Sequence, residues 1–194
     1  MKKQFPIILA FISILVFAGL ILKHESHLQN SQSIYVELAP VDPRSMLQGD
    51  YMTLNYELYF DGVREGNPGE ESHENNKLRE ALQQQIQNQS KILSYVQLDA
   101  QRRVIQTSFN QNHLKANPEN TARLVLKNPT NHLQNLYPAA NSFLFAEGLE
   151  PCYRNAKYAE LRIKPDGQAL LAGLVDKNLN SLNCESQKNW AEKS

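Results

Sequence analysis

The feature that most limits the fold is an uninterrupted run of eighteen uncharged residues at positions 5–22, FPIILAFISILVFAGLIL. As an α-helix this run would be about 27 Å long, close to the roughly 30 Å hydrocarbon core of a bilayer. It is longer than the apolar region of about 7–15 residues in a signal peptide, although the VFA at 16–18 would serve as a cleavage site. We therefore expect a single N-terminal transmembrane helix that stays attached as an anchor, with a cleaved signal peptide as the alternative.

Charges on either side of this run predict its orientation. Lys2 and Lys3 precede it, whereas Lys23 follows it with Glu25 close by. Cytoplasmic flanks of membrane helices carry the excess of positive charge, so the N-terminus is expected inside. The rest of the chain is then expected outside the cytoplasm.

The chain divides into three parts by composition. Residues 1–28 hold a cytoplasmic stub, the anchor and a polar spacer, and residues 33–176 form one globular domain. Residues 177–194 are polar and lack periodicity, so we expect a loose C-terminal tail there.

Most of the globular domain has the pattern of β-strands. In residues 50–60 apolar and polar side chains alternate, so that one face is a core face and the other is a polar face with two tyrosines, Tyr51 and Tyr59. The turn signal KPDG at 164–167 predicts a hairpin. We expect a mainly β protein with some helix, its domain an antiparallel β-rich fold. Further strands are expected at 33–40, 92–99, 102–109, 122–128, 142–148, 158–163 and 168–176.

Residues 61–90 interrupt the strand pattern with a loop and a helix. The loop at 61–76 is rich in Gly, Asn and Glu. Within residues 74–91 the apolar positions have the spacing of an amphipathic helix. Because the apolar stripe is thin and the other face is rich in Gln, we expect this helix on the surface of the domain. The apolar positions are Leu78, Ala81, Leu82 and Ile86.

The segment VDPRSMLQGDY, residues 41–51, predicts a sharp corner between two strands. Asp42 is a suitable N-cap and Pro43 suits the first position of a helical turn. Gly49 can end that turn in a left-handed conformation. Arg44 and Asp50 would then be close enough to pair across the turn. A corner of this kind is explained by local structure without any ligand.

The continuation of this segment, GDYMTLNYE, resembles the signature of the bacterial GDYXXLXY protein family. The matching positions are Gly49, Asp50, Tyr51, Leu54 and Tyr56, and the segments VDPRS and YAELRIKPDGQALLAGL are similar to other recurrent segments of that family. The resemblance implies a membrane-anchored bacterial protein of no established biochemical function. It also implies a multi-pass membrane protein as a partner, because such a protein is often encoded nearby. Together with the orientation predicted from the flanking charges, the resemblance makes the bacterial inner membrane the expected location, with the domain facing the periplasm.

Four residues are candidates for contact with a partner or ligand: Arg44, Asp50, Tyr51 and Tyr59. Tyrosine and arginine are common anchors of protein interfaces, and the two tyrosines share the polar face of one strand. The alternative is that both tyrosines pack beneath the insertion at 61–90. On the first interpretation the protein is a binding or assembly module.

An envelope hydrolase with an unrecognised active site is the alternative function. Ser45-Met46 is similar to the Ser-Met motif of signal-peptidase-like proteases, which use a lysine as the base. Arg102 and Arg103 occupy the region where that lysine is expected, and arginine stays protonated and cannot accept the serine proton. We therefore assign no catalytic residue from the sequence.

The charge balance, the histidines and the cysteines limit which partners, cofactors and disulfides we expect. Twenty Lys and Arg balance twenty Asp and Glu without a basic stripe, so no nucleic acid partner is expected. The five histidines do not form the set of three or four ligands that a zinc site needs, so neither a metal nor another cofactor is expected. Cys152 and Cys184 would form one disulfide in an oxidising compartment or remain two thiols, and their spacing leaves both possibilities open.

Overall fold

The computed structural model describes residues 5–39, 51–60, 73–114, 120–146 and 148–186, and it divides the chain into two units, Met1–Ser31 and Gln32–Ser194. The first unit contains helix α1 (Phe5–Asn30), whose side chains at positions 11–23 are exposed. In the part of the chain that the structure describes, no helix combines the length and the apolar character needed to cross a membrane.

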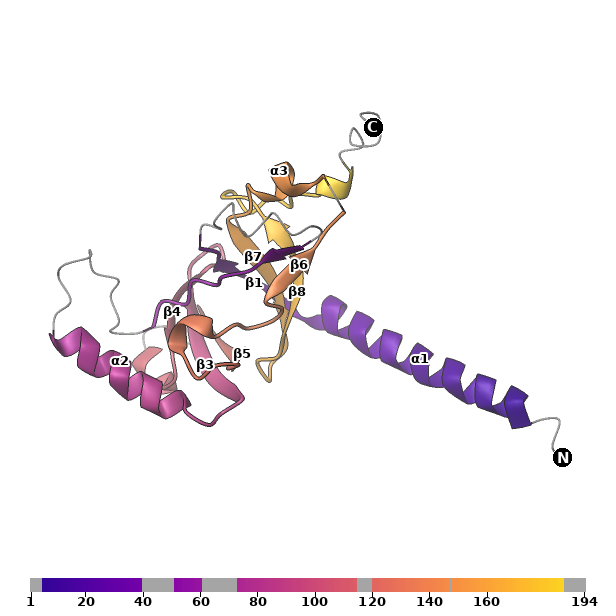
Figure 1. Cartoon of the computed structure of the whole chain (residues 1–194), viewed down its shortest axis with the longest axis horizontal. Coiled ribbons are helices and arrows are strands. Elements are labelled where there is room, and N and C mark those ends of the chain that lie inside the picture. The colour runs from indigo at the N-terminus through magenta and orange to yellow at the C-terminus, as the bar shows by residue number, and fades with distance from the viewer. Residues whose placement is uncertain (1–4, 40–50, 61–72, 115–119, 147, 187–194) are drawn as a thin grey trace. The chain divides into compact units, whose positions relative to one another are not determined.

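The second unit is built mainly from short antiparallel strands, as the alternating sequence predicted. Within the described residues they form three small sheets with the strand orders β1-β7-β8, β2-β6 and β4-β3-β5 (Figure 1). The strands are β1 (Gln32–Glu37), β2 (Tyr51–Thr53), β3 (Lys91–Leu98), β4 (Val104–Ser108), β5 (Thr121–Lys127), β6 (Ser142–Leu144), β7 (Tyr158–Ile163) and β8 (Ala169–Val175). The helices of this unit are α2 (His73–Ile86), α3 (Glu150–Tyr153) and the short 3₁₀ helices Gln111–Leu114, Leu133–Asn135 and Cys184–Ser186.

The strand expected at 50–60 is regular only over β2, because its partner β6 pairs with three residues and then leaves. Isolated bridges from Tyr56 to Leu38 and from Phe60 to Thr107 hold the rest of the segment in an extended conformation. The alternation of buried and exposed side chains continues through the segment, with residues 52, 54, 56 and 60 buried and residue 58 half-buried. The core face that the sequence predicted is therefore confirmed at four of its five positions.

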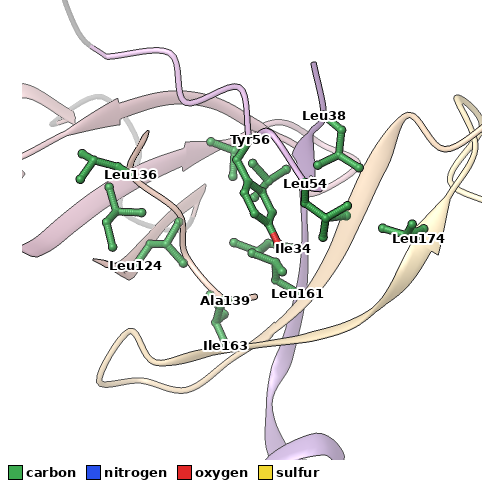
Figure 2. Packing of buried hydrophobic residues seen from close by; sticks show 14 of the residues in the cluster. Ile34, Leu38, Leu54, Tyr56, Leu124, Leu136, Ala139, Leu161, Ile163 and Leu174 are labelled. Atoms are coloured by element: carbon green, nitrogen blue, oxygen red, sulfur yellow. The ribbon is translucent and has the colours of Figure 1, made fainter. Parts of the chain in front are cut away.

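One hydrophobic core joins the three sheets. Figure 2 shows the ring of Tyr56 pointing into this core, and its hydroxyl donates a hydrogen bond of 2.6 Å to the carbonyl of Ala140. Burial raises the pKa of Tyr56, so the phenol stays protonated. Leu54 and Tyr56, two residues of the family signature, thus lie in the core. The core residues that are fully buried include Ile34, Val36, Val96, Leu124, Leu126 and Leu161.

The β7–β8 hairpin turns at KPDG, as predicted, and the turn packs directly against β5. Gly167 has a φ of +88°, and its carbonyl accepts a hydrogen bond of 2.8 Å from the amide of Val125. A Cβ at position 167 would lie 3.2 Å from the carbonyl carbon of Arg123 and from the amide nitrogen of Leu124. This glycine therefore allows two sheets to meet.

We expect Gly167→Ala to lower the free energy of unfolding by about 2–3 kcal/mol, since alanine is strained at a positive φ and its methyl group would press on the β5 backbone. Gly148→Ala is the matched control, because Gly148 has a similar φ of +84° with open space around it. That control should cost only about 1 kcal/mol. Urea unfolding measures both, and equal losses would show that the contact with β5 contributes nothing.

The sequence predicted the β3–β4 hairpin but not the hydrogen bonds that form its turn. The carboxylate of Asp99 accepts hydrogen bonds from the amides of Gln101 and Arg103 and pairs with the Arg103 guanidinium. Partial burial of Asp99 opposes ionisation, but these hydrogen bonds outweigh it and lower the pKa of Asp99. Arg102 has a φ of +64° and donates from Nε to the carbonyl of Ser33 at 2.6 Å, which joins this turn to β1.

Residues 177–186 differ from the loose tail that we expected. Cys184 is fully buried and is joined to Cys152 by a disulfide. The hydroxyl of Tyr153 donates a hydrogen bond to Glu185, and burial followed by this bond raises the pKa of Tyr153. The segment packs on the domain because the disulfide and this bond hold it there. The polar composition alone could not indicate either contact.

Candidate functional site

The structure separates the four residues that the sequence proposed as contacts. Tyr51 lies on β2 opposite Leu144, and both side chains are exposed, by 43% and 74%. Tyr59 is 37% exposed, and its hydroxyl donates a hydrogen bond of 2.9 Å to Glu37. Both tyrosines are therefore partly exposed. The predicted corner, with Asp42, Pro43, Arg44, Ser45, Gly49 and Asp50, lies outside the described residues.

The described residues form a cleft of about 710 Å³. This volume lies within the range of roughly 300–1,000 Å³ that is common for ligand sites. Residues 55–60 form one wall, helix α2 forms the opposite wall, and the turn at 132–134 closes one end. Tyr59 lines the cleft and Tyr51 does not. The lining residues are Ala39, Asn55, Tyr56, Glu57, Leu58, Tyr59, Phe60, Arg79, Glu80, Gln83, Gln84, Gln87, His132, Leu133 and Gln134.

Helix α2 is held in place by its C-terminal end. Ile86 is fully buried in the core, and the side-chain amide of Asn128 donates to the carbonyls of Ile86 at 2.9 Å and Gln89 at 2.8 Å. Asn88 has a φ of +63°, a left-handed conformation that ends a helix. The helix therefore ends at Ile86 and not at 91, as its apolar pattern suggested. Leu82 packs half-buried beside Ile86, whereas Ala81 is exposed.

Gln83 joins the helix to the turn at 132–134. Its side-chain oxygen accepts a hydrogen bond of 3.3 Å from the amide of Leu133, and its side-chain nitrogen donates to the carbonyl of Asn131. The amide of Asn88 donates to the side chain of Asn131 at 3.2 Å. Side-chain amides thus fix helix α2 to the turn that closes the end of the cleft.

The other wall is an extended backbone held along one edge. The amide of Ala39 donates to Asn55 at 2.9 Å, the amide of Glu57 donates to Glu37 at 2.8 Å, and the amide of Thr107 donates to Tyr59 at 2.6 Å. This wall is therefore continuous with β1 and β4, which makes it a rigid element of the domain.

A charged group stands at the rim of the cleft. Glu37 accepts the Tyr59 hydroxyl on one oxygen and pairs with Lys157 Nζ at 2.7 Å on the other. The hydrogen bond to Glu37 is the main cause that raises the pKa of Lys157, so this side chain stays charged at neutral pH. Among the described residues, no group of three His, Cys, Asp or Glu side chains is placed to hold a metal ion.

The chemistry of the lining is dominated by amides. Four side chains, those of Asn55, Gln84, Gln87 and Gln134, each carry a donor and an acceptor, and the amide of Gln83 is bonded to the turn as described above. Glu57, Glu80 and Arg79 add charges of both signs, and His132 adds an imidazole ring. The sequence showed the glutamines, but we interpreted that face of the helix as solvated. Only the fold shows that it faces residues 55–60.

Comparison with protein families matches residues 13–174 to the GDYXXLXY protein model. The chain belongs to that family. The resemblance seen in the signature segment is thereby confirmed, and the matched region of this GDYXXLXY protein contains all three parts of the cleft. Comparison with curated proteins gave no match, and neither did comparison with solved structures.

Proposed function

We propose that this GDYXXLXY protein is a membrane-anchored binding or assembly module whose domain works outside the cytoplasm with a multi-pass membrane partner. The cleft between residues 55–60 and helix α2 is the proposed recognition site. The proposed location of the protein is the bacterial inner membrane, with the N-terminus inside and the domain in the periplasm.

The anchor is supported by the surface of α1. Large apolar side chains are exposed along this helix, with Phe11 at 65%, Phe17 at 65% and Leu22 at 69%. Exposed apolar surface of this extent is costly in water and favourable in a bilayer. The residues 5–22 carry no charge that would oppose insertion.

The amide-rich lining of the cleft is the observation that carries the binding role. Side-chain amides hold a ligand by hydrogen bonds and do not ionise at neutral pH. Leu58, Phe60 and Leu133 add apolar contact area to the same cleft. A concave site that combines apolar area with a few fixed polar groups is typical of specific binding.

The test is crosslinking in intact cells with a photoreactive amino acid at Gln134, in the cleft, and at Tyr51, outside it. Gln85 lies on the exposed face of α2 away from the cleft and is the control position. We expect a multi-pass membrane protein to be captured from Gln134 and not from Gln85. Capture from Tyr51 alone would place the contact on β2 and β6 and would contradict the assignment to the cleft.

The hydrolase alternative makes a different prediction in the same cells. A serine hydrolase would label with a broad serine-reactive probe, whichever serine is its nucleophile. If labelling occurs and no partner is captured at Gln134, the binding module proposed here is wrong.

A further inference from the structure

The extended wall of the cleft has one edge that is paired and one edge that, among the described residues, is paired only at its start. Backbone groups of successive residues in an extended chain point to opposite edges. The backbone groups of residues 55, 57 and 59 form hydrogen bonds on the edge that faces β1 and β4, as described above. The backbone groups of the even-numbered residues therefore point to the other edge.

That second edge is covered at its start and then becomes open. The amide of Leu54 donates to the carbonyl of Asn141 at 2.9 Å, and β6 pairs with residues 51–53. Upstream of Asn141 the chain leads away, because Tyr137 exchanges backbone hydrogen bonds with Lys127 on β5. Within the described part of the chain, no backbone–backbone hydrogen bond involves Tyr56 or Leu58. The open edge begins where the cleft begins.

The glutamines of the opposite wall complement such an edge. A side-chain amide carries the same donor and acceptor as a peptide group, so Gln84 and Gln87 can bond the outer edge of a chain lying in the cleft. The charges of the lining are mixed in sign and select no strong net charge. An extended stretch of polypeptide without a strong net charge would complement both walls at once.

We propose that the cleft binds an extended segment of a partner protein as an added β-strand beside residues 56–60. The inference rests on the proposed binding function and specifies its ligand. The backbone of the segment bonds Tyr56 and Leu58 along one edge, and its other edge meets the glutamines of α2. In this mode main-chain hydrogen bonds supply affinity, and side-chain pockets supply selectivity.

The first experiment selects binders from a phage-displayed library of random peptides against the full chain in detergent micelles. Affinity of the selected peptides is then measured by fluorescence anisotropy for the wild type, Gln84→Trp and Gln85→Trp. Both substituted positions are exposed glutamines on the same helix, and only Gln84 lines the cleft. We expect Gln84→Trp to weaken binding by more than about tenfold and Gln85→Trp to leave it unchanged. Equal affinity for all three proteins would overturn the proposal.

The second measurement distinguishes strand addition from other ways of filling the cleft. Amide hydrogen exchange, followed by NMR with and without a selected peptide, should slow at Leu58 by about tenfold or more. Exchange at Glu57 should change little, because its amide already bonds to Glu37. Peptides that depend on Gln84 without slowing exchange at Leu58 would overturn strand addition while leaving the cleft as a binding site.

Two further outcomes keep the proposals separate. Self-association of the full chain that is lost in Gln84→Trp would show that the occupant is a second copy, and it would overturn the partner segment. A membrane protein crosslinked at Gln134 while no peptide binds the cleft would overturn the strand ligand but keep the binding module.

Discussion

Replacing Ile86 by alanine is expected to lower the free energy of unfolding by about 2–5 kcal/mol. Ile86 is fully buried in the core, so the truncation removes apolar contacts and leaves a cavity that the surrounding sheets can fill only in part. The loss is measured by urea unfolding followed by circular dichroism. Gln85→Ala, one residue away and exposed, should stay within about 0.5 kcal/mol of the wild type.

This substitution should also affect the cleft before the whole domain unfolds. Ile86 anchors the helix that forms one wall, whereas the other wall belongs to the β-strands. At low denaturant concentration, Ile86→Ala should therefore weaken the binding of the selected peptides, while the circular dichroism signal of the strands persists. Unchanged peptide affinity would show that helix α2 is dispensable for the site. A loss of less than about 1 kcal/mol in the free energy of unfolding would show that the helix is loosely packed.

Removing the disulfide is expected to cost about 3–4 kcal/mol, because the bond closes a loop of 32 residues and limits the freedom of the unfolded chain. The double substitution Cys152→Ala with Cys184→Ala shows the effect without burying a new hydroxyl. Thermal unfolding with and without a reducing agent provides a second route to the same quantity.

The double substitution and the reducing agent each serve as a control for the other. Reducing agent should lower the stability of the wild type by a similar amount and should leave the double variant unchanged. If the variant is as stable as the oxidised wild type, the bond does not stabilise the domain. In that case the other contacts of residues 177–186, such as that from Tyr153 to Glu185, are sufficient to hold the segment.

Local patterns predicted those parts of the fold that depend on local physics. A period of two placed Met52, Leu54, Tyr56 and Phe60 on the core side because alternate residues of an extended chain share a face. The turn at 164–167 followed from residues that suit its backbone angles. Leu58 is half-buried because it lies at the cleft, where the covering layer is incomplete.

Features that depend on distant residues were beyond the sequence. The end of α2 is fixed by Asn128, which lies 42 residues after Ile86 in the chain. The docking of residues 177–186 depends on whether Cys184 bonds to Cys152, which the spacing of the two cysteines left open. The cleft needs three separate segments, and the glutamines acquire their meaning only when α2 faces residues 55–60.

The attachment of α2 through its last turn has a consequence for how this family can diversify. Ile86, Leu82 and Asn128 hold the helix, while Gln84 and Gln87 project from its exposed surface into the cleft. Under the proposed binding role, substitutions at these two glutamines would alter what the site accepts at little cost in stability. Folding and the proposed recognition would then be assigned to different residues of one helix, so that a change of ligand need not disturb the scaffold.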